Sequence, residues 1–110
     1  MIEQTLKQLQ NKVQTNSALD QKSKEQVLDL LADLKAEVEE LSETNRNKAE
    51  SITGYAGVYT HEALSIPVNT PLLDHSLLGL NTSIEEFEGS HPKLISTVNA
   101  FCARLSSMGL

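Results

Sequence analysis

Residues 71–108, PLLDHSLLGLNTSIEEFEGSHPKLISTVNAFCARLSSM, carry the strongest structural signal in the sequence. Two interleaved series of residues recur here at intervals of seven, offset by four, as the two core positions of a heptad do. All of these positions are apolar except His91. Such a seam predicts helices with coiled-coil-like packing and a candidate interface along the seam. The apolar seam residues are Leu73, Leu77, Leu80, Ile84, Phe87, Leu94, Val98, Phe101, Leu105 and Met108.

The motif GSHP at 89–92 interrupts this seam. Proline in a helix interior removes a hydrogen bond and clashes with the preceding turn, but it is favoured in a first turn. We therefore expect one helix over about 71–88 and another over about 91–108, with the serine as N-cap. Because the heptad phase is kept, the break is predicted to be a kink or a tight joint. The candidate joint residues are Ser90, His91 and Pro92, of which the histidine supports the helix start or, alternatively, acts as a pH-sensitive group.

Residues 1–50 contain no glycine, proline or aromatic residue, so this half is expected to be nearly all helix. Apolar residues recur at steps of three and four in two stretches, which predicts helices over about 2–15 and 20–44. Ser17 or Asp20 is expected to cap the second of these helices.

The helical period is lost over about 45–70, which is predicted to be an irregular connecting segment. An ordered cover, a short β-ribbon, a flexible linker and a functional insertion all remain open for it. Its two tyrosines, Tyr55 and Tyr59, are interpreted as a lid over the ends of the helices or, if exposed, as interface anchors.

Parts of both halves resemble a bacterial family of small helical proteins. FEGSHPKL at 87–94 and SMGL at 107–110 are similar to the F-E-x-S-H-P-x-L and terminal M-G patterns of domain-of-unknown-function family 4404, and the leucine pattern over 19–34 is similar to its first half. The stretch from about 46 to 70 departs from that family, because it is longer and more apolar than the usual short polar connection. The resemblance implies a bacterial, cytoplasmic, all-helical protein, and it carries over no catalytic residues.

The predicted fold is all-α, with one helical domain over 1–110. Fully helical, the two halves would form arms of about 63 Å and 57 Å at 1.5 Å per residue. In an antiparallel hairpin, 20–44 would lie against 71–88, and 2–15 against the last helix. Such a hairpin leaves wide apolar stripes exposed, so it predicts a homo-oligomer, most simply a two-fold dimer. A compact helical bundle, in which both arms fold at their breaks, does not require one.

Composition excludes several classes of function. The formal net charge of −6 argues against nucleic-acid binding, which needs a surplus of Lys and Arg. No apolar run approaches the roughly 20 residues that cross a bilayer, and no signal peptide is evident, so a cytoplasmic location is expected. The single cysteine, Cys102, is expected to be a small buried apolar residue.

Catalytic and metal chemistry is not expected. His61, His75 and His91 are spaced like no common metal motif, and no constellation of acid, base or cofactor-binding groups is recognisable. No cofactor is predicted. We therefore predict a non-enzymatic protein–protein interaction or structural module that self-associates through its seam. The alternative is a regulatory accessory subunit, such as an inhibitor or antitoxin-like partner of another protein.

Overall fold

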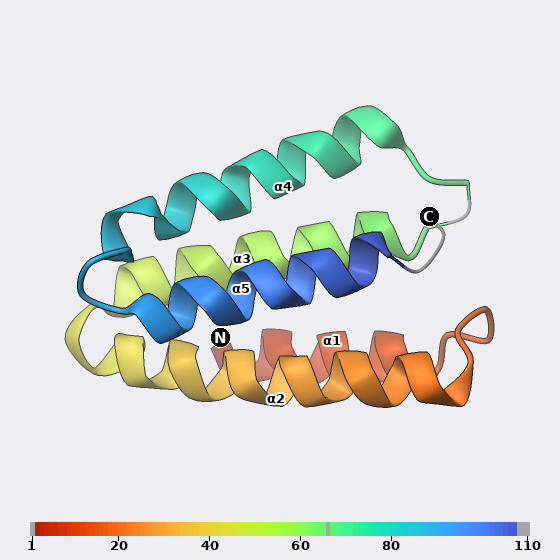
Figure 1. Cartoon of the computed structure of the whole chain (residues 1–110), viewed down its shortest axis with the longest axis horizontal. Coiled ribbons are helices and arrows are strands. Elements are labelled where there is room, and N and C mark those ends of the chain that lie inside the picture. Colours follow the sequence, from red (N-terminus) through yellow and green to blue (C-terminus); the bar gives the residue numbers. More distant parts are fainter. Residues whose placement is uncertain (1, 66, 108–110) are drawn as a thin grey trace.

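The structure is a computed structural model that describes residues 2–65 and 67–107. Its helices are stacked in three layers. α1 and α2 form one layer, α3 and α5 the middle one, and α4 the third (Figure 1). The all-α prediction is confirmed. The elements are α1 (Ile2–Gln14), α2 (Gln21–Thr44), α3 (Arg46–Ala63), α4 (Thr70–Ile84), the 3₁₀ turn η1 (Glu85–Phe87) and α5 (Pro92–Ser106).

The largest difference from the sequence prediction is α3, which fills most of the segment expected to be irregular over about 45–70. The joint between α2 and α3 is a single residue, Asn45. Its backbone N–H donates to the Leu41 carbonyl at 2.8 Å, and its side chain accepts from the backbone N–H of Lys48. One asparagine therefore ends one helix and caps the next.

The helical period of α3 is not evident in the sequence, because small residues make up most of its buried stripe. Thr53 and Thr60 are buried, and their hydroxyls donate to the carbonyls of Ala49 and Ala56, each at 2.8 Å. These bonds satisfy polar groups that would otherwise be costly to bury. The full buried stripe of α3 is Ala49, Ile52, Thr53, Ala56, Tyr59, Thr60 and Ala63.

The antiparallel pairing predicted for an extended hairpin is wrong. In the described part of the chain, α2 packs on α5 and α3 and not on α4, and α1 packs on α3 and α2 and not on α5. The molecule measures 37 × 26 × 23 Å, which leaves no room for straight arms of about 60 Å. The compact-bundle alternative is the correct one, with α3 as an additional helix at its centre.

The heptad seam is the core of a single chain rather than a free surface. Seven of its members are buried: Leu80, Ile84, Phe87, Leu94, Val98, Phe101 and Leu105. Leu73 and Leu77 are partly buried and pack against the same core, whereas Met108 lies outside the described residues. The seven buried members therefore correct the predicted interface, because their apolar surface is already covered from within. For the partly buried Leu73 and Leu77 the interface stays a prediction.

The joint at Ser90, His91 and Pro92 reverses the chain instead of kinking one helix. α4 and α5 run in opposite directions in adjacent layers (Figure 1). The serine does not cap α5, because its hydroxyl lies 3.0 Å from Nδ1 of His91, which itself holds the N-cap position. The His91 ring stands edge-on to that of Phe87, with centroids 5.5 Å apart. The histidine is thus placed to support the joint, and its alternative role in pH sensing stays a hypothesis.

Tyr59 links the central helix to α5. Its hydroxyl donates to the Cys102 carbonyl at 3.3 Å and lies 3.1 Å from Oγ of Ser106. Only 1% of the residue is exposed, and burial raises the pKa of its phenol above 10.0. This tyrosine is a core residue, and neither the lid nor the anchor interpretation holds for it.

Replacing Tyr59 by Phe should remove these hydrogen bonds while keeping the ring. We expect the free energy of unfolding to fall by about 1 kcal/mol. Tyr55→Phe is the matched control, since the hydroxyl of the other tyrosine makes no hydrogen bond within the described residues. Urea unfolding of both variants measures the difference, and equal losses would contradict the assignment.

Asp20 caps α2, because its carboxylate accepts from the backbone N–H of Ser23 at 2.7 Å. This bond holds the pKa of Asp20 below its ordinary value of 3.8. The carboxylate therefore stabilises the fold above pH 3.8, and the contribution is lost as the pH falls through the lowered pKa.

Asp20→Asn keeps a capping oxygen but removes this titration. Below pH 3.8 we expect the melting temperature of the parent protein to fall more steeply than that of the variant. Circular dichroism melts across the acid range provide the measurement. Parallel pH profiles would show that the cap contributes no pH-dependent stability.

Candidate interaction surface

Large apolar side chains reach the solvent on one pair of helices. In the described part of the chain, every exposed large hydrophobic residue lies on α3 or α4. Tyr55 and Val58 of α3 are 43% and 51% exposed. Leu72 and Leu78 of α4 are 51% and 63% exposed. We call these residues the α3–α4 apolar residues.

A groove of ≈ 530 Å³ runs between α3 and α4 and has the ring of Tyr55 and the side chain of Leu78 in its walls. The ring packs against Gly79, where an added Cβ would be 2.6 Å from Cδ1 of Tyr55. The remaining walls are polar. They are formed by Lys48, Ser51, His75, Thr82 and Ser83.

The antiparallel register of the two helices is marked at two levels. Nζ of Lys48 lies 2.9 Å from Oε1 of Glu86 at the end near η1, and Tyr55 meets Gly79 two turns further along α3. The same register brings Leu72 level with Glu62, near the C-terminal end of α3, whereas Leu78 lies level with Ala56, near the middle of both helices.

A second groove of ≈ 530 Å³ separates α3 from α1, and Gly54, Val58 and His61 contribute to its walls. Nζ of Lys12 and Nδ1 of His61 are 2.8 Å apart across it. Gly54 is exposed, and a Cβ placed on it would meet nothing within 4 Å. The outward side of α3 is therefore a ridge between two grooves, with the exposed Val58 and the side-chain-free Gly54 on it.

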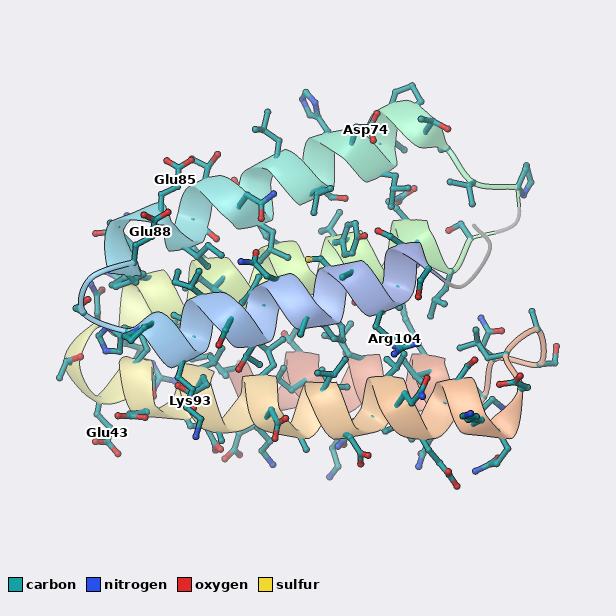
Figure 2. The ribbon with its side chains drawn as sticks, viewed as in Figure 1. Glu43, Asp74, Glu85, Glu88, Lys93 and Arg104 are labelled. Carbon is teal, nitrogen blue, oxygen red and sulfur yellow. The ribbon has the colours of Figure 1, made fainter. Side chains whose placement is uncertain are left out.

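The charge around these helices is acidic. Residues 60–90 contain five acids and no Lys or Arg. The basic residues at the start of α3 are engaged locally, Arg46 with Glu50 at 3.2 Å and Lys48 with Glu86. Figure 2 shows Asp74 and Glu85 on the outer α4 layer, whereas Lys93 and Arg104 leave α5 toward α2.

The residues singled out from sequence are thus divided between core and surface. The seam lies inside, Tyr59 is buried, and only Tyr55 matches the interpretation of an exposed aromatic anchor. Sequence reasoning missed Val58, Leu72 and Leu78 as surface residues. The available signal was in 72–78, where two leucine pairs, Leu72-Leu73 and Leu77-Leu78, cover more of the helix circumference than one buried face can use.

Within the described residues, no group of three or more His, Cys, Asp or Glu side chains is placed to hold a metal ion. Cys102 is buried as expected, and burial raises the pKa of its thiol to about 11. A thiol of this kind is protonated at neutral pH and is a poor nucleophile.

Comparison with family models, curated proteins and solved structures found no match to this chain. The resemblance to domain-of-unknown-function family 4404 therefore stays a prediction. Across residues 2–65 and 67–107, no helix combines the length and apolarity required for a membrane span.

The glycines of α3 and α4 provide a test of this surface. Gly54→Ala should raise the free energy of unfolding by up to about 1 kcal/mol, because alanine favours the helix and the new methyl group points into open space. Gly79→Ala, the matched control, should lose this gain or destabilise the protein, because the methyl group displaces the Tyr55 ring. Chemical denaturation of both variants is the measurement. Equal gains would show that Tyr55 does not pack on Gly79.

Proposed function

We propose that this chain is a small helical protein–protein interaction module that binds another protein through the α3–α4 apolar residues. The supporting observation is the confinement of the large exposed hydrophobic side chains to one pair of helices, while those of the other described helices are buried or partly buried. Exposed apolar surface on a soluble protein is typical of a binding site, and two of these side chains, Tyr55 and Leu78, share the walls of one groove. An exposed tyrosine backed by a glycine is a good anchor, since aromatic residues dominate binding energy at interfaces.

Burial of the seam changes the surface through which a second copy of the chain would bind. A dimer through the seam would require the core to open, so a second copy would have to bind at the α3–α4 apolar residues instead. A regulatory accessory subunit would bind its target through the same residues. A bacterial and cytoplasmic setting and a non-catalytic role belong to the proposal, and the free buried thiol of Cys102 is compatible with a reducing compartment.

Site-specific photo-crosslinking in the native cell tests the proposal. A photoreactive phenylalanine at Leu78 should give a discrete crosslinked product, to be identified by mass spectrometry. The same amino acid at Ala36, which is exposed on α2, is the matched control and should give none. The purified partner should then bind about tenfold more weakly to Leu78→Ser than to the parent protein.

Leu78 is 63% exposed, so Leu78→Ser should leave the melting temperature nearly unchanged. This keeps a loss of binding separate from a loss of folding. Equal crosslinking at Leu78 and Ala36, or no product at Leu78, would overturn the proposal.

A further inference from the structure

We infer that the partner segment is a basic amphipathic helix of another protein, laid along α3 and α4 with its apolar side on Tyr55, Val58 and Leu78. This inference rests on the proposed function and adds the chemistry of the partner. It follows from the shape of the surface and from its charge, which are separate observations.

The shape fits a helix. α3 and α4 are antiparallel neighbours with a groove of ≈ 530 Å³ between them, and side-chain ridges of a third helix pack into such a groove. On the ridge of α3, Gly54 lacks a side chain, although no described residue lies within 4 Å of the place that a Cβ would take. A mid-helix glycine is unfavourable by itself, whereas it allows a second backbone to approach closely. Gly54 and Val58 are one turn apart, so this approach would lie beside an exposed apolar contact.

The charge fits a cationic partner. Along the outer side of α4, Leu78 has Asp74 one turn before it and Glu85 about two turns after it. Neither acid makes an ion pair within the described residues, and α4 contains no Lys or Arg. A helix that covers Leu78 would bring its flanking side chains to these carboxylates, so Lys and Arg there would be attracted.

A second copy of this chain fits less well. A two-fold contact through Leu78 would place an acidic surface against itself, and residues 60–90 offer no Lys or Arg to compensate. Lys48 lines the groove beside Leu78, and it is already paired with Glu86. Like charges disfavour this pairing, so a foreign basic segment is the better occupant.

The test uses synthetic helical peptides of the length of α4 as probes. One has leucines along a single helical stripe and lysines elsewhere. The second replaces every lysine by glutamate, and the third keeps the composition of the first but disrupts the stripe. Fluorescence anisotropy with the full chain should show binding of the first peptide only, weakened by added salt.

Variants locate the binding. Leu78→Ser should weaken the lysine peptide about tenfold, and the double variant Asp74→Asn/Glu85→Gln should weaken it to a similar extent. Asp33→Asn/Glu40→Gln removes the same charge from exposed positions of α2 and should have little effect. Failure of the lysine peptide to bind, or equal losses from the α2 and α4 variants, would overturn the inference.

Other outcomes separate this inference from the proposed function. Binding of the glutamate peptide that is lost in Leu78→Ser would keep the interaction surface and reject the basic partner. Sedimentation showing a dimer that Leu78→Ser dissociates would identify a second copy as the occupant and reject the inference as well.

Discussion

The fold depends on the burial of α3 by helices on several sides. α1, α2, α4 and α5 all pack on it, and α4 has little other contact with the bundle. Alanine and threonine on the buried stripe of α3 leave room for these neighbouring helices, where larger residues would hold them apart. The hydroxyls of Thr53 and Thr60 donate to carbonyls of their own helix, at Ala49 and Ala56. Without this helix, the buried faces of α1 and α4 would lose their main partner.

The small residues of α3 explain what could be predicted and what could not. The leucine and valine stripes of α1, α2 and α5 have a clear helical period, and these helices end within about two residues of the expected limits. The stripe of α3 follows the same period, but small and polar residues mask it, and Gly54 and Gly57 suggest a loop. The low helix propensity of these residues favoured an irregular segment, but packing against the neighbouring helices stabilises a helix there.

The heptad seam shows a second limit of sequence reasoning. Its spacing correctly marks positions that face the core, because seven of its residues are buried. Periodicity does not reveal the direction of the chain, however, and the turn around Ser90 sends α5 back across the molecule. The preserved phase was therefore compatible with a reversal as well as with a kink, and the pairing of helices could not follow from it.

The exposed apolar residues were less predictable from the sequence, because the packing of neighbouring helices decides which side chains are exposed. Leu77 and Leu78 are adjacent in sequence, yet the first packs against the core and the second is 63% exposed. An exposed leucine contributes little to folding, and an exposed mid-helix glycine such as Gly54 opposes it. Local choices in a chain usually agree with its fold, and departures concentrate at functional sites. Here such departures lie on two neighbouring helices, α3 and α4, which argues that the stability of the isolated chain is not the only constraint on these helices.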